Sequence, residues 1–145
     1  MAENDKSLQI LLVDDNPGDV RLVVETLKEG TIEHRINVAY DGEEALEFLH
    51  RKGKYSAAPV PEIVLLDLKL PKRSGLEVLA DMRKHRELKD IPVIVLTSSE
   101  AENDIRQAYG NEANCYVTKP IDLDRFIVTI KSIESFWVTI IKGEN

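Results

Sequence analysis

Short apolar runs recur along the chain, and each is followed by a segment in which apolar residues return with the period of a helix. The run from Ile63 to Leu66 contains only apolar residues; it is too short for a helix and typical of a strand buried on both faces. Similar runs, and one segment that alternates apolar and polar residues, predict further strands. The predicted strands cover residues 8–13, 36–40, 63–67, 91–96 and 115–119.

Signals for the start of a helix follow these strands. Asn16 precedes Pro17, a pair typical of an N-cap and a first helical residue, and the helical period then continues to Gly30. Residues 51–61 contain glycine and prolines and are predicted to form one long loop. The other predicted helices are marked by the capping-box pairs Asp41 with Glu44 and Ser74 with Glu77, by residues 101–109, and by Asp122 ahead of residues 123–141.

The alternation of strands and helices predicts a doubly wound α/β fold, in which a parallel sheet carries helices on both faces. Such folds place their chemistry at the carboxyl ends of the strands. Asp67 ends the central predicted strand, and Asp14 and Asp15 follow the first. If these two strands are neighbours, the three carboxylates converge in one small volume.

Carboxylates that converge in this way repel one another, each pair by roughly 1 to 4 kcal/mol at a separation of about 4 Å. A hard divalent cation, Mg²⁺ or Mn²⁺, is expected among them, because such ions take oxygen ligands and leave positions for water and a phosphoryl group. Lys119 would add a positive charge from the last strand, and Thr97 a hydroxyl. A carboxylate nucleophile, a metal ion, an ammonium and a hydroxyl together indicate phosphoryl transfer to Asp67.

Length and charge narrow the function further. A chain of 145 residues fits a single domain, predicted to span residues 1–145. The formal net charge of −7 argues against nucleic acid as a direct partner. The chain has neither a secretion signal at its start nor an apolar run near the ~20 residues of a membrane span. We therefore expect a soluble, cytoplasmic protein that binds neither nucleic acid nor membrane.

The late apolar residues predict an interface. A helix from Asp122 to about Lys142 would be ~30 Å long, whereas a neighbouring strand should span only ~17 to 20 Å. Its last turns would overhang the sheet and expose a large apolar patch, which usually marks a contact surface. We expect a homodimer or a partner-binding tail, rather than a segment that folds back, built on Phe136, Trp137, Ile140 and Ile141.

Other chemistries fit less well. The histidines His34, His50 and His85 are scattered along the chain, and we interpret them as forming neither a metal cluster nor a catalytic pair. A metal-dependent phosphatase with an aspartate nucleophile would require a second aspartate at the position of Lys69. A flavin- or nucleotide-binding module would require a glycine- or hydroxyl-rich loop after the first strand. The acidic pair Asp14-Asp15 stands at that position and would repel phosphate.

The chain resembles the receiver domains of two-component response regulators from Leu8 to about residue 135. Each matching motif stands at the end of a predicted strand, and their joint order is highly specific. The motifs are the acidic pair Asp14-Asp15, Asp67 with Pro71 and Gly75 behind it, Thr97 followed by Ser98, Tyr116, and Lys119-Pro120.

The resemblance implies a role for each residue of the metal site. Asp15 would be a direct metal ligand, and Asp14 would orient the metal, also through water. Asp67 would be the phosphoacceptor as well as a ligand, and Lys69 would offer its main-chain carbonyl to the metal.

The resemblance also implies a switch. Lys119 would pair with the phosphoryl group, Thr97 would move to hydrogen-bond it, and Tyr116 would rotate inward as the aromatic partner of Thr97. The implied fold is the flavodoxin-like receiver fold, with a five-stranded parallel sheet in the order 2-1-3-4-5 and five helices, here with an extended last helix.

The similarity is closer to the small stand-alone regulators that are paired with bacterial phytochromes. It is carried by the long loop before the central strand, by Asp67 to Lys72, by Asn114 to Lys119 and by Phe136-Trp137. It implies a response regulator without an output domain, phosphorylated by a sensor histidine kinase for which a phytochrome is the candidate. Such a protein assists its own phosphorylation and dephosphorylation but turns over no external metabolite. Its signal would pass to a downstream protein, or its phosphoryl group to a histidine phosphotransfer protein as in a phosphorelay.

Overall fold

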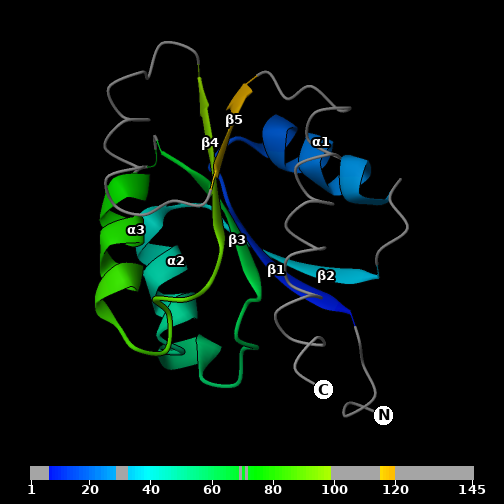
Figure 1. Cartoon of the computed structure of the whole chain (residues 1–145). Coiled ribbons are helices and arrows are strands. Elements are labelled where there is room, and N and C mark those ends of the chain that lie inside the picture. The colour runs from blue at the N-terminus through cyan, green and yellow to red at the C-terminus, as the bar shows by residue number, and fades with distance from the viewer. Residues whose placement is uncertain (1–6, 29–32, 69, 71, 99–114, 120–145) are drawn as a thin grey trace.

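The computed structural model describes residues 7–28, 33–68, 70, 72–98 and 115–119; for 97–98 and 115–119 it describes the main chain. A parallel sheet runs through the middle of the molecule, in the strand order β2-β1-β3-β4-β5 (Figure 1). This order and the parallel sense confirm the predicted sheet. The strands are β1 (Leu8–Val13), β2 (His34–Ala39), β3 (Ile63–Asp67), β4 (Val93–Ser98) and β5 (Cys115–Lys119).

Helices cover both faces of the sheet, as a doubly wound fold requires. One face carries α1 (Pro17–Lys28), and the other carries α2 (Gly42–Leu49) and α3 (Gly75–Lys84) (Figure 1). Among the described residues, no helix is both long enough and apolar enough to cross a lipid bilayer. The helices predicted at residues 101–109 and 122–142, and so the extended last helix, lie outside the described residues.

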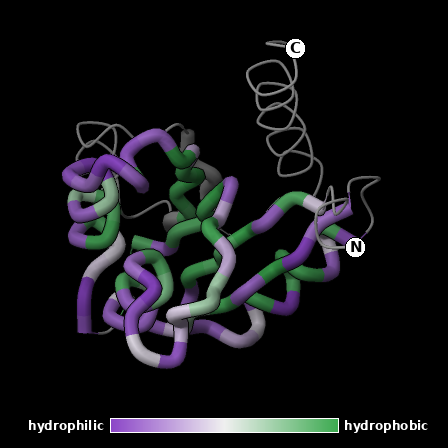
Figure 2. Tube along the Cα trace, turned by 90° about the horizontal axis from the view of Figure 1, so that it is seen from below, coloured by the Kyte–Doolittle hydropathy of each residue, from purple (hydrophilic) through white to green (hydrophobic). Residues whose placement is uncertain are grey.

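The core consists of two apolar layers, because successive side chains of a strand point to opposite faces of the sheet. Every residue of β3 is buried, as the apolar run from Ile63 predicted. Figure 2 shows the hydrophobic segments gathered inside and the hydrophilic ones around them. Leu11, Val13, Val64 and Leu66 pack with α2 and α3, whereas Ile10, Leu12, Ile63 and Leu65 pack with Val20, Val23 and Leu27 of α1.

The helix starts are fixed by side chains close in sequence. At α3, the Ser74 hydroxyl accepts the Glu77 N–H at 3.2 Å and the Glu77 carboxylate accepts the Ser74 N–H at 3.0 Å, which confirms the predicted capping box. At α2 the prediction was half right. Asp41 accepts the Glu44 N–H, but the Glu44 carboxylate accepts the N–H of Tyr40 rather than that of Asp41.

The loop before β3 is more ordered than predicted, because it contains the 3₁₀ helix η2 (Gly53–Tyr55). The Tyr55 ring packs edge-on against Phe48 with ring centroids 5.3 Å apart, and its hydroxyl donates to Glu44 Oε2 at 2.6 Å. Burial, the hydrogen bond to Glu44 and nearby carboxylates raise the pKa of Tyr55 to about 12. These contacts hold the loop against α2.

Two strands differ from the prediction at both ends, because β2 covers His34–Ala39 rather than residues 36–40 and β4 covers Val93–Ser98 rather than residues 91–96. Tyr40 lies outside β2 and is 49% exposed, because the chain turns there into the cap of α2. β4 starts at Val93 rather than Ile91. Pro92 between them has no N–H to donate, although its carbonyl accepts the N–H of Val64 at 3.0 Å.

Candidate functional site

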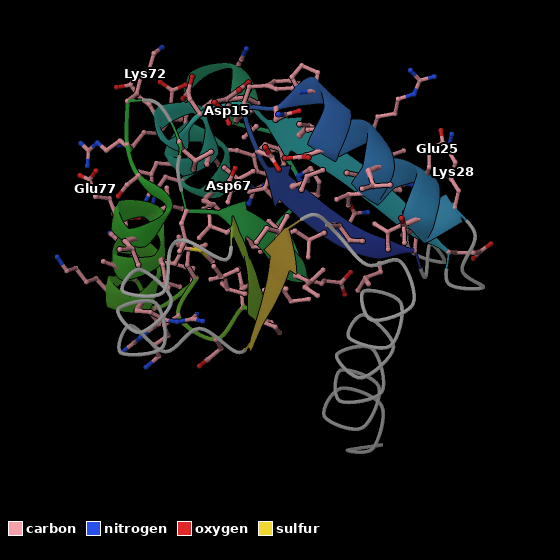
Figure 3. All side chains as sticks on the ribbon, turned by 90° about the horizontal axis from the view of Figure 1, so that it is seen from above. Asp15, Glu25, Lys28, Asp67, Lys72 and Glu77 are labelled. Carbon is pink, nitrogen blue, oxygen red and sulfur yellow. The ribbon has the colours of Figure 1, made fainter. Side chains whose placement is uncertain are left out.

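Three aspartates meet at the carboxyl edge of the sheet. β1 and β3 are neighbours, with Val13 opposite Leu66, so Asp14 and Asp15 emerge beside Asp67. Each aspartate offers a carboxylate oxygen, and these atoms lie within 4.8 Å of one another. Figure 3 looks onto this edge and shows Asp15 and Asp67 between α1 and α3. The convergence expected from the sequence is therefore observed.

The three carboxylates differ in burial. Asp14 is fully buried; its N–H donates to the Ala39 carbonyl at 3.0 Å and its Oδ1 accepts the N–H of Asn16 at 2.9 Å. Asp67 is 7% exposed, whereas Asp15 is exposed to solvent. The cluster thus has a fixed inner side and an outer side that water can reach.

The start of α3 approaches the end of β3 closely. The Gly75 N–H donates to the Leu68 carbonyl at 2.9 Å. A Cβ at Gly75 would lie 2.2 Å from the Asp67 main-chain oxygen and 2.7 Å from the Leu68 Cα, which is closer than a side-chain carbon can come. Glycine at this position therefore lets α3 begin directly behind Asp67.

The donor set fits a hard divalent cation. All its ligand atoms are carboxylate oxygens, the type that Mg²⁺ and Mn²⁺ prefer, and the accessible outer side leaves coordination positions for water and a phosphoryl group. Lys72 lies in the loop after β3. Its Nζ is 3.7 Å from Asp41 Oδ2, and its side chain points away from Asp67 in Figure 3. A bound cation would offset the mutual repulsion of the carboxylates.

The strand register brings the main chain of other predicted residues to the same edge. Asp67 pairs with Leu96, so Thr97 is one residue further along β4. Ser98 pairs with Lys119 at the ends of β4 and β5, whereas Tyr116 pairs with Val95 and lies three residues before the end of β5. The side chains of Thr97, Tyr116 and Lys119, and all of Lys69, Phe136, Trp137, Ile140 and Ile141, lie outside the described residues.

Two of the histidines that are scattered along the sequence lie together in the structure, in a second group of ligand-type side chains. His50, Asp81 and His85 each offer a ligand atom, and these atoms lie within 4.8 Å of one another. His50 follows α2, whereas the other two belong to α3 and its C-cap, so helix packing unites residues that are distant in sequence. The four-residue spacing of Asp81 and His85 was the sequence signal for two of the three members of this group.

Comparison with known proteins identifies the family. The response regulator receiver domain matches residues 10–131. The chain is 46% identical to the response regulator Rcp1 of Synechocystis sp. over 129 residues, which make up 89% of this chain and 88% of that protein. The match therefore covers most of both proteins.

Solved structures agree with this match. The Mn²⁺-bound form of Rcp1 is 45% identical, with a TM-score of 0.78, and the match covers 90% of this chain and 94% of that one. The phosphorylated cyanobacterial phytochrome response regulator RcpA is 42% identical, with a TM-score of 0.80 and coverage of 92% and 96%. This chain belongs to the family of response regulator receiver domains.

Proposed function

We propose that Asp67 accepts a phosphoryl group from the phosphohistidine of a sensor histidine kinase, in a reaction that requires Mg²⁺ or Mn²⁺. The observation that carries the proposal is the meeting of Asp14, Asp15 and Asp67 within 4.8 Å at the carboxyl edge of the sheet. Membership of the receiver family and the Mn²⁺-bound form of the relative Rcp1 support both the reaction and the metal.

In this proposal Asp14, Asp15, Asp67 and the Lys69 main-chain carbonyl hold the cation. When bound, the cation neutralises charge that develops on the oxygens of the transferring phosphoryl group. Asp15 is exposed and is the ligand that an incoming ion meets first. Asp14 is held by its hydrogen bond from Asn16, so it orients the ion from the buried side.

The transfer forms one bond to phosphorus and breaks another. One carboxylate oxygen of Asp67 forms a bond to phosphorus while the phosphorus–nitrogen bond of the phosphohistidine breaks. The imidazole leaves with that bonding electron pair and takes up a proton, and Asp67 becomes an acyl phosphate. Lys119, at the end of β5, pairs with the phosphoryl oxygens.

Phosphorylation adds negative charge at the carboxyl edge of the sheet, and this charge drives the output. Thr97, on β4, hydrogen-bonds the phosphoryl group, and Tyr116, on β5, follows its movement. The resulting change of surface is read by a downstream protein, or the phosphoryl group passes to a histidine phosphotransfer protein.

The metal requirement can be measured with acetyl phosphate as donor. We expect wild-type protein to gain the mass of one phosphoryl group with Mg²⁺ and none with excess EDTA. Asp15→Asn should slow the reaction by at least about tenfold at a fixed Mg²⁺ concentration, because it removes a charged ligand. Asp90→Asn, an exposed acid outside the cluster, is the matched control and should react at the wild-type rate. Equal rates with EDTA and with Mg²⁺ would refute the metal site.

The similarity to RcpA, a phytochrome response regulator, supports a phytochrome-type kinase as the donor. With radiolabelled, autophosphorylated kinases as donors, we expect label to appear on this protein within seconds from a phytochrome-type kinase and far more slowly from unrelated kinases. Slow transfer from every phytochrome-type kinase, with fast transfer from another class, would assign a different partner while leaving Asp67 as the acceptor.

A further inference from the structure

His50, Asp81 and His85 form a cluster on the face of the sheet that α2 and α3 cover. His50 Nε2 lies 2.6 Å from Asp81 Oδ2, and His85 Nδ1 lies 3.6 Å from the same oxygen. The two imidazole rings meet edge to face, with centroids 4.5 Å apart and planes at 72°. Two imidazoles and a carboxylate therefore converge where the C-terminal end of α2 meets α3.

The cluster is open to solvent. The side chains of His50, Asp81 and His85 are 22%, 29% and 43% exposed, and they line a cavity of about 560 Å³ between α2 and α3. Leu46, Lys52 and Arg73 also line this cavity. An ion from solution can reach the ligand atoms without any movement of the main chain.

We propose that His50, Asp81 and His85 bind a late first-row transition metal ion, with Zn²⁺ as the expected ion. Two nitrogen ligands and one oxygen ligand suit Zn²⁺, which binds imidazole nitrogen at about 2.0 to 2.1 Å and often keeps water as its fourth ligand. The bound ion joins the C-terminal end of α2 to α3. No part of this assignment depends on phosphorylation of Asp67.

The ligand atoms need little rearrangement. Atoms that share a tetrahedral Zn²⁺ lie about 3.3 Å apart. His50 Nε2 and Asp81 Oδ2 must therefore separate by less than about 1 Å, which exchanges their hydrogen bond for two bonds to the metal. His85 Nδ1 lies 2.8 Å from the Asp81 main-chain oxygen, an acceptor, so this nitrogen donates in the metal-free protein. An ion bound through Nε2 keeps that hydrogen bond as an outer support, and an ion bound through Nδ1 replaces it.

The two clusters should select different ions. The aspartate cluster has oxygen ligands alone and suits Mg²⁺, whereas imidazole ligands favour Zn²⁺. They also lie at opposite ends of the molecule. His50 and His85 are the C-caps of α2 and α3, and these two helices end toward the bottom of Figure 1. The aspartates stand at the carboxyl ends of β1 and β3, and these strand ends lie toward the top of the same view. Excess Mg²⁺ can therefore occupy one cluster while Zn²⁺ is titrated into the other.

The test is a calorimetric titration of Zn²⁺ into the protein with millimolar Mg²⁺ present. We expect one Zn²⁺ per chain, and an affinity loss for His50→Gln and for His85→Gln greater than the roughly 10- to 100-fold that follows loss of an outer-shell partner. His34→Gln is the matched control, because it changes the third histidine of the chain, on β2, and should leave the affinity unchanged. Asp15→Asn should also leave it unchanged.

A second measurement uses the wild-type protein alone and does not depend on folding of the variants. In spectra of the histidine rings, Zn²⁺ should shift the signals of His50 and His85 but not those of His34, and EDTA should reverse the shift. Absence of Zn²⁺ binding in Mg²⁺, equal affinity in all three histidine variants, or binding that is abolished by Asp15→Asn alone would overturn the assignment.

Discussion

Asp67→Asn is expected to abolish phosphorylation by acetyl phosphate and by the donor kinase. Asparagine keeps the shape of the side chain, but its neutral amide oxygen is a far weaker nucleophile than a carboxylate. Intact mass after incubation with Mg²⁺ and acetyl phosphate should show one added phosphoryl group on wild-type protein and none on Asp67→Asn. Asp90→Asn should gain the group as wild-type protein does, since this exposed acid lies outside the cluster.

The same variant should remain folded. Asp67 lies with Asp14 and Asp15 inside 4.8 Å, so removal of its charge relieves repulsion when no metal is bound. We expect Asp67→Asn in EDTA to unfold at the wild-type temperature or above it, as followed by circular dichroism. A phosphoryl group on the folded variant at the wild-type rate would place the acceptor on another residue.

Gly75→Ala is expected to destabilise the domain by about 1 to 3 kcal/mol, the usual cost of an extra methyl group in a filled space. The new Cβ would lie 2.2 Å from the Asp67 main-chain oxygen and 2.7 Å from the Leu68 Cα. Main-chain atoms cannot rotate away as the end of a side chain can, so α3 or the end of β3 must shift. Urea unfolding measures the loss of free energy of unfolding, provided that the dependence on urea concentration is the same in the variant and the wild-type protein.

Gly18→Ala is the matched control, since Gly18 lies in the first turn of α1. The added Cβ would approach only Asn16 Oδ1, at 3.1 Å, and this atom belongs to a side chain that can move away slightly. Because alanine favours a helix over glycine by up to about 1 kcal/mol, we expect Gly18→Ala to be neutral or slightly stabilising. If Gly75→Ala were equally stable, the contact behind Asp67 would be looser than the structure indicates.

Much of the fold could be predicted because its signals are local. The apolar run from Ile63 predicts a strand buried on both faces, and all five residues of β3 are buried. Asn16, Asp41 and Ser74 cap helices because their side chains accept an N–H three residues ahead. The errors arose where one side chain has more than one hydrogen-bond partner within reach. Glu44 reaches back to Tyr40 rather than to Asp41, and Tyr55 draws part of the long loop into a 3₁₀ turn against α2.

The aspartate cluster was predictable for a topological reason. In a parallel sheet the carboxyl ends of all strands share one edge, so residues that end neighbouring strands must be close. Asp14, Asp15 and Asp67 follow from that rule once β1 and β3 are known to be neighbours. The close approach of Gly75 to the main chain of Asp67 could not be predicted from this rule, because it depends on the distance between the main chains of α3 and β3.

The sequence by itself determined the alternation of strands and helices, the helix caps and the aspartates that follow the strands, since each depends on burial or on neighbours along the chain. Only the tertiary structure decided that His50 would meet Asp81 and His85. That contact depends on how far α2 and α3 extend beyond their strands and how they pack side by side, and no periodicity along the chain encodes the rotation of one helix against another.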